Sequence, residues 1–199
     1  MFTSAFPELV RKCIMLDAFG TFTRPEADGP KALRMGALKY DKYTATNGKV
    51  FTSKEEAAQF MLKNYANSLT LSSATLLASR QLVQVGPTAY QFRYDRRMII
   101  PSLIQPSEEM VLGFFRAVVC PVLLVVPRTK DSVLRVNPSS NIVEKVKKRF
   151  AALRKNNQQS RYVQLVEAKG HHFHINTPQV AVASILDFIQ EIDLPKAKL

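Results

Sequence analysis

Residues 161–189 read RYVQLVEAKGHHFHINTPQVAVASILDFI. All histidines of the chain lie in this stretch, namely His171, His172 and His174. Residues 162–166 alternate with the period of two that is typical of a β-strand, whereas apolar side chains in residues 178–189 recur at the helical spacing of 3.6. Thr177 is a favourable N-cap, and Pro178 fits the first helical turn, where its missing N–H costs nothing. We therefore predict a strand, a loop that carries the histidines, and a helix that begins just after them.

Two other apolar runs predict strands that are covered on both faces. Residues 12–17 (KCIMLD) and residues 122–126 (VLLVV) are almost continuously apolar, a pattern typical of parallel strands with helices above and below the sheet. In an open α/β sheet, the loops at the carboxyl ends of the strands carry the chemistry. The histidine loop is therefore the candidate functional site.

These segments resemble parts of the α/β-hydrolase superfamily. Residues 170–178 (GHHFHINTP) resemble the loop in which a triad histidine follows a glycine, about seven residues before the proline that opens the last helix. Residues 120–126 (CPVLLVV) resemble the penultimate core strand, and residues 6–17 (FPELVRKCIMLD) resemble the helix end and strand that follow the nucleophile. Within the superfamily, the chain is most similar to the serine hydrolase-like, or kraken-like, proteins. The resemblance implies a partial α/β-hydrolase fold with about three parallel core strands, flanking helices and an inserted helical lid.

The resemblance also implies a chemistry, which is hydrolysis of ester-like acyl bonds by a Ser-His-Asp triad without a cofactor. A serine attacks an ester only when a histidine takes its proton and a carboxylate orients the ring. By its distance from Pro178, His171 occupies the place of the base, and His172 is the next candidate. Asp131 is the candidate acid, and Asp17 is the alternative acid, whose other possible role is to cap a turn or helix.

A metal site is the less favoured interpretation of the histidines. In an extended loop, neighbours point in opposite directions, so His172 and His174 can share a side while His171 faces the other way. A metal bound by His172 and His174 would need further Cys, Asp or Glu ligands. We expect no metal site, and we expect His174 to pack or hydrogen-bond within the loop.

The nucleophile is missing from this sequence. A hydrolase serine sits in a G-x-S-x-G elbow between a strand and a helix, and no serine here is flanked by glycines at that spacing. Ser4 lies where helix residues are expected. The chain thus resembles the carboxyl-terminal part of a hydrolase, and we expect it to be inactive alone. The alternative is a non-catalytic binding or regulatory protein that uses a lid pocket or an open sheet edge.

An open edge would have a consequence for association. With the nucleophile strand missing, the strand at 12–17 would lack a neighbour on one side. A bare apolar edge favours pairing with another chain. We therefore expect this chain alone to self-associate or to be poorly soluble.

Residues 20–100 predict an inserted lid domain between two parts of the core, residues 1–19 and 101–199. We predict helices over 30–43, over a stretch that begins at the capping-box signature of residues 53–56 (SKEE), and over 72–85. An extended segment at 90–94 then returns to the core. By the resemblance, the lid supplies the walls of a pocket for a small acyl substrate.

The charge is strongly positive, with a net charge of +12 over 199 residues. The densest basic cluster lies on a helix predicted from the spacing of Ile142, Val146, Phe150 and Leu153. Its members are Lys145, Lys147, Lys148, Arg149, Arg154 and Lys155. No nucleic-acid motif or aromatic stacking pattern accompanies it, so we interpret it as a solvated helix face and expect no nucleic-acid partner.

The remaining features concern location. Cys13 and Cys120 lie beside apolar strands, which indicates reduced thiols. No apolar run approaches the roughly 20 residues that a membrane span needs. The final residues Ala197, Lys198 and Leu199 resemble the Ser-Lys-Leu peroxisomal address. We therefore expect a peroxisomal protein that binds the import receptor, with the cytoplasm as the alternative location.

Overall fold

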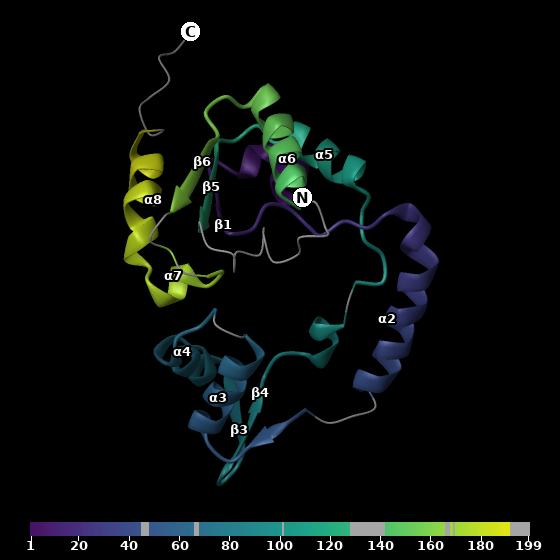
Figure 1. The fold of residues 1–199 in the computed structure, drawn as a ribbon, viewed down its shortest axis with the longest axis vertical. Coiled ribbons are helices and arrows are strands. Elements are labelled where there is room, and N and C mark those ends of the chain that lie inside the picture. Colours follow the sequence, from purple (N-terminus) through teal and green to yellow (C-terminus); the bar gives the residue numbers. More distant parts are fainter. Residues whose placement is uncertain are drawn as a thin grey trace. The chain divides into compact units, whose positions relative to one another are not determined.

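The chain divides into two compact units. The computed structural model describes residues 1–44, 48–65, 68–100, 102–127, 142–165, 168 and 170–191. The first unit, here called the sheet unit, comprises Met1–Thr21 and Glu109–Leu199, and the second, the inserted unit, comprises Phe22–Glu108 (Figure 1). No helix among the described residues is both long and apolar enough to cross a bilayer.

The sheet unit contains a parallel sheet of three strands. β1 (Cys13–Leu16), β5 (Val122–Pro127) and β6 (Arg161–Leu165) lie in the order β1-β5-β6, so β5 is central. Cys13 stands opposite Val122 in the first pair, and Leu123 stands opposite Arg161 in the second. Both pairs are parallel, which confirms the predicted set of three parallel strands.

Side chains of the central strand alternate between two cores. Val122, Leu124 and Val126 pack on one face with α5 (Glu108–Arg116) and α6 (Ile142–Asn156). Leu123 and Val125 pack on the other face with α7 (Phe173–Asn176) and α8 (Gln179–Glu191). Figure 1 shows α8 on one side of the sheet and α5 and α6 on the other. This covering of both faces explains why β5 is a continuous apolar run.

The first residues form two short helices. α1 (Phe2–Ala5) is followed by the 3-10 helix η1 (Pro7–Leu9). The helix end expected around Ser4 and before the first strand is therefore interrupted at Phe6, whose dihedral angles (φ −131°, ψ 64°) are not helical and which precedes a proline.

One member of the predicted basic face is buried. Arg149 is 6% exposed, and its Nη1 donates to the carbonyl oxygen of Phe19 at 2.8 Å. The reason is its helical spacing, because Arg149 lies three residues after Val146 and four before Leu153, which are both buried. Lys147 and Lys148, on the opposite side of α6, are exposed as predicted.

The inserted unit combines helices with a second sheet. Its helices are α2 (Gly29–Thr44), α3 (Lys54–Asn64) and α4 (Leu71–Gln81), with the 3-10 helices η2 (Glu26–Asp28) and η3 (Arg96–Ile99). Its strands, β2 (Val50–Phe51), β3 (Leu82–Gly86) and β4 (Ala89–Phe92), form an antiparallel sheet in the order β2-β4-β3.

The three predicted helices are present, and the predicted extended segment at 90–94 overlaps β4. The helix predicted over 82–85 is wrong, because these residues lie in β3. The helix predicted over 72–85 ends at Gln81, and Leu82 begins a hairpin in which Val83 lies opposite Gln91. The β-branched Val83 and Val85 favour a strand, and Pro87 and Thr88 form the turn of the hairpin between Gly86 and Ala89.

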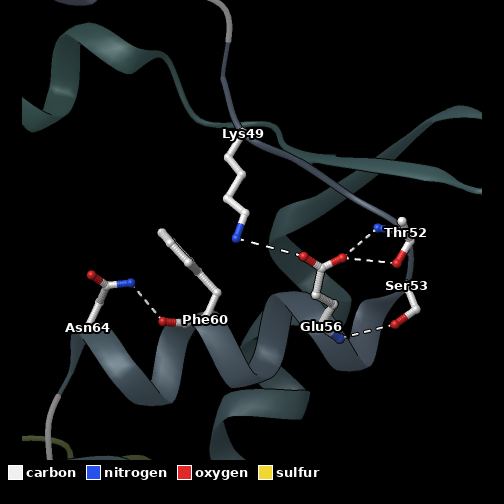
Figure 2. A network of polar contacts seen from close by, with 6 residues as sticks. All are labelled: Lys49, Thr52, Ser53, Glu56, Phe60 and Asn64. Atoms are coloured by element: carbon white, nitrogen blue, oxygen red, sulfur yellow. Dashed lines mark hydrogen bonds and ion pairs between the residues drawn. The ribbon is translucent and has the colours of Figure 1, made fainter.

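The predicted start of α3 is confirmed (Figure 2). The Oγ of Ser53 accepts from the N–H of Glu56 at 3.1 Å, which is one half of a capping box. The carboxylate of Glu56 accepts from the N–H and hydroxyl of Thr52 at 2.8 and 3.0 Å, so its bonds reach one residue before the N-cap. Lys49 lies 3.7 Å from this carboxylate and 4.6 Å from the centroid of the Phe60 ring.

The burial of the central strand predicts that two leucine substitutions lower the free energy of unfolding by very different amounts. Leu124 is 0% exposed and Leu186 is 48% exposed. We expect Leu124→Ala to lower the free energy of unfolding by about 2–5 kcal/mol, because it removes buried methyl groups and leaves a cavity. The matched Leu186→Ala change should cost less than about 0.5 kcal/mol. Urea unfolding followed by circular dichroism measures both, and equal losses would contradict this assignment of the core.

Candidate functional site

Asp17 ends the first strand in a special backbone conformation. Its N–H donates to the carbonyl oxygen of Val125 at 2.8 Å, which extends the pairing of β1 with β5 by one residue. Its φ of +47° lies in the left-handed region, where aspartate is one of the few residues with a side chain to be found regularly. The side chain is fully buried. A carboxylate is therefore held at the carboxyl end of β1, away from solvent.

The histidines follow the last strand in a turn and a short helix. Gly170 adopts φ +70°, a conformation that glycine takes without strain, and His171 and His172 form the turn after it. The carbonyl oxygen of His172 accepts from the N–H groups of Ile175 and Asn176, each at 2.9 Å, so α7 begins directly after His172.

The prediction of a plain loop is therefore wrong for His174, which lies within α7. The prediction that neighbouring histidines point in opposite directions is also wrong, because it assumed an extended chain. The ring centroids of His171 and His172 are 4.7 Å apart. His174 lies 6.4 Å from His171 and 5.9 Å from His172, so all three rings form one cluster.

One hydrogen bond joins the histidine turn to the first strand. The Nδ1 of His171 lies 2.9 Å from the Oδ2 of Asp17, although the two residues are 154 positions apart in the chain. A carboxylate only accepts, so Nδ1 carries the hydrogen and Nε2 has the lone pair that can take a proton. The His171 side chain is 28% exposed while that of Asp17 is 0% exposed. The arrangement is a buried carboxylate within hydrogen-bonding distance of a partly accessible imidazole.

The two neighbouring histidines are uncharged at neutral pH. Burial lowers the pKa of His172 from 6.5 to about 4, and the nearby charges of His171 and His174 lower it further, while Asp17 acts in the opposite direction. Burial also lowers the pKa of His174, with a smaller contribution from His171. Positive charge in the cluster is therefore disfavoured at His172 and His174.

The structure brings together two of the residues singled out from the sequence, His171 and the alternative acid Asp17. Asp131 and the address at 197–199 lie outside the described residues, so their roles stay predictions. Ser4 lies in α1, and its Oγ donates to the carbonyl oxygen of Met1 at 2.7 Å. Across the described ranges, no group of three or more His, Cys, Asp or Glu side chains is arranged to hold a metal ion.

Sequence reasoning missed the role of Phe173. Its side chain is completely buried among Leu123, Val125 and Phe188, so it fixes the helix that carries His174. The signal was present as a large apolar residue in the middle of the polar run HHFH.

Two known proteins are similar to this chain in sequence. No protein-family model matches the chain. A serine hydrolase-like protein of Dictyostelium discoideum is 26% identical over an alignment of 207 residues, which covers 94% of this chain and 51% of that protein. A serine hydrolase-like protein of Danio rerio is 25% identical over 195 residues, which cover 96% of this chain and 56% of that protein. The chain thus spans about half the length of the curated relatives it matches.

Solved structures share the fold. A hypothetical protein of Pseudomonas aeruginosa superposes with a TM-score of 0.71 at 24% identity, over 91% of this chain and 58% of that chain. The thioesterase domain of the curacin biosynthetic pathway gives a TM-score of 0.66 at 17% identity, over 95% and 61%. An alpha/beta hydrolase of Novosphingobium aromaticivorans gives a TM-score of 0.56 at 18% identity, over 94% of this chain and 60% of that chain. These likenesses confirm the predicted partial α/β-hydrolase fold.

The half-buried His172 predicts a pH dependence of the free energy of unfolding. The folded-state pKa of His172, about 4, lies below its ordinary value of 6.5, so the unfolded chain binds more protons between these values. The contribution of His172 to stability is therefore complete above about pH 6.5 and falls as the pH drops toward about 4. We expect His172→Phe to show a smaller loss between pH 7 and pH 4 than the wild type in urea unfolding. An unchanged pH dependence in the variant would contradict the burial of a neutral ring.

Proposed function

We propose that this chain acts as a member of the α/β-hydrolase superfamily, which its likenesses support, and that Asp17 and His171 are the acid and base of a Ser-His-Asp triad that hydrolyses an ester-like acyl substrate. The observation that carries the proposal is the 2.9 Å hydrogen bond between the Nδ1 of His171 and the Oδ2 of Asp17.

Each residue of the pair has a defined task in acyl transfer. The Nε2 of His171 takes the proton of the attacking serine and later gives it to the leaving group. Asp17 keeps the hydrogen on Nδ1, so that Nε2 faces the reaction as a base, and its negative charge stabilises the imidazolium that forms. Burial of the carboxylate supports this task, because few water molecules compete for its lone pairs.

Asp17 supports the role of acid better than Asp131, the first choice from the sequence. The Nδ1 of His171 carries a single hydrogen, and the carboxylate of Asp17 lies within bonding distance of it. The two residues also follow β1 and β6, the strands on either side of β5, at the carboxyl edge of the sheet. That edge is where open α/β sheets carry their functional residues.

The serine of the proposed triad lies outside these 199 residues. The sequence contains no G-x-S-x-G motif, and the hydroxyl of Ser4 donates to a carbonyl oxygen of its own helix. The matches cover 51% and 56% of the relatives' own lengths, which leaves room for a nucleophile elbow in a longer protein of this kind.

An active-serine probe tests the proposal and separates the two acids. We expect a fluorophosphonate probe to leave the 199-residue chain unlabelled, and to label the full product of the native transcript, including any codons upstream of Met1, at a serine outside this chain. In that product, His171→Ala and Asp17→Asn should slow labelling roughly 10²- to 10⁴-fold, the range expected for loss of general base catalysis. Asp131→Asn is the matched control and should label at nearly the wild-type rate.

Two results would overturn the proposal in different ways. If Asp131→Asn slows labelling and Asp17→Asn does not, the acid is wrongly assigned. If the native protein has a mass of 22.4 kDa and no serine reacts, the hydrolytic role is wrong.

The open edge of the sheet favours a second candidate function, binding of another chain. Among the described residues, β1 pairs only with β5, so it is an edge strand of the sheet, the kind of strand to which another chain can pair. The segment before it exposes Phe2 of α1 and Phe6, the residue that follows α1, at 59% and 48%. Their ring centroids are 5.1 Å apart. An apolar surface beside an unpaired strand is suited to strand addition by a partner.

Light scattering tests this candidate. We expect the 199-residue chain to be larger than a 22.4 kDa monomer, and Phe6→Lys to shift it toward the monomer, because a charge opposes burial of the apolar surface. Leu71→Lys, at an exposed leucine of the inserted unit, is the matched control and should leave the mass unchanged. A monodisperse wild-type monomer would contradict the binding role of the edge.

A further inference from the structure

We propose that His172 and His174 are positioning residues, whose rings pack beside His171 and hold its imidazole in the orientation that bonds Asp17. The inference deepens the proposed function and rests on it, because it concerns how the proposed base is kept in place.

The support begins in the core. Phe173 is fully buried and packs with Leu123 and Val125 of the central strand and with Phe188 of α8. Its two sequence neighbours are His172 and His174, so the position of each histidine backbone is set by this anchor. The ring of His174 lies perpendicular to that of Phe173, at a centroid distance of 5.8 Å and an angle of 89°.

The backbone adds a second restraint. The carbonyl oxygen of His172 accepts two N–H groups of α7, from Ile175 and Asn176, and the N–H of Thr177 donates to the carbonyl oxygen of Phe173 at 2.9 Å. The turn that carries the histidine rings is therefore fixed at its start by hydrogen bonds and at its centre by a buried phenylalanine.

The ring contacts extend this restraint to the side chain of His171. The centroids of His171 and His172 are 4.7 Å apart at an angle of 56°, and those of His171 and His174 are 6.4 Å apart at 78°. Tilted and perpendicular arrangements at 4.5–7 Å are the favourable ones for aromatic pairs. His171 is thus held by the carboxylate of Asp17 at Nδ1 and by two rings around it.

Neutral rings suit this task better than charged ones. Burial lowers the pKa of both His172 and His174, so neither carries a positive charge at neutral pH. When His171 accepts a proton, a charged neighbour would oppose the new charge, whereas a neutral neighbour would not. The only charge of opposite sign described in contact with the cluster is that of Asp17.

Nuclear magnetic resonance of the 199-residue chain tests the inference without any catalysis. The observable is the proton on Nδ1 of His171, through its chemical shift and its rate of exchange with water at pH 7. In His172→Ala, we expect exchange to be roughly three- to tenfold faster, the factor that the free energy of an aromatic pair provides. His172→Phe keeps a ring without nitrogen and should restore the wild-type rate. His174→Ala should act in the same direction with a smaller change, because its ring is farther away.

Controls separate positioning from general destabilisation. Val180→Ala trims the same core beneath α7 and α8 without removing a ring, so it should lower stability and leave the His171 proton unchanged. If His172→Ala does not fold, the comparison of His172→Phe with His172→Gln decides. Positioning by the ring requires Phe, and not Gln, to match the wild type.

Three results would overturn the inference. The first is an exchange rate of the His171 Nδ1 proton that is unchanged in His172→Ala. The second is a failure of His172→Phe to restore the wild-type rate. The third is an equal change of the rate in Val180→Ala. None of them depends on a nucleophile, so failure of the proposed function, seen as absence of probe labelling in the native protein, is a separate outcome.

Discussion

The pairing of β5 with a strand on each side is the constraint on which the rest of the structure depends. Asp17 follows β1 and His171 follows β6, and neither strand contacts the other directly in the order β1-β5-β6. Their side chains meet only because both strands run parallel to β5 and end at the same edge of the sheet. Parallel registers of Ile14 with Leu123 and of Leu124 with Tyr162 set the heights of the two strand ends, and so the 2.9 Å hydrogen bond between residues 154 positions apart.

The same strand packs against one side of the site through the buried core. β5 has all six of its residues buried, and its two faces contribute to separate cores. The face with Leu123 and Val125 holds Phe173, and Phe173 holds the turn of the histidines. Burial of apolar surface by this one strand thus orders the helices on both sides and the residues proposed to act in acyl transfer.

Sequence patterns predicted the parallel strands and the helices α6 and α8, because burial on two faces gives continuous apolar runs and amphipathic helices give a period of 3.6. They failed where local preference competes with tertiary packing. Residues 82–86 continue an apolar helical pattern but form a hairpin strand. Arg149 was predicted to lie on the solvated face of its helix because it is charged, but it is buried because its position lies on the core side of that helix. Asp17 was ranked second as the acid because a distance between segments so far apart in the chain cannot be deduced from spacing.

The backbone of Asp17 has a consequence for mutational tolerance. At φ +47°, most residues with a Cβ are strained, and glycine, asparagine and aspartate are the ones that adopt this conformation at low cost. Of these three, aspartate alone offers an anion to the imidazole. Two independent filters, one steric and one electrostatic, therefore converge on a single amino acid at this position. Almost every substitution of Asp17 should therefore strain the backbone or remove the anion. Neighbouring positions of the same strand, in contrast, can exchange among apolar residues of similar size.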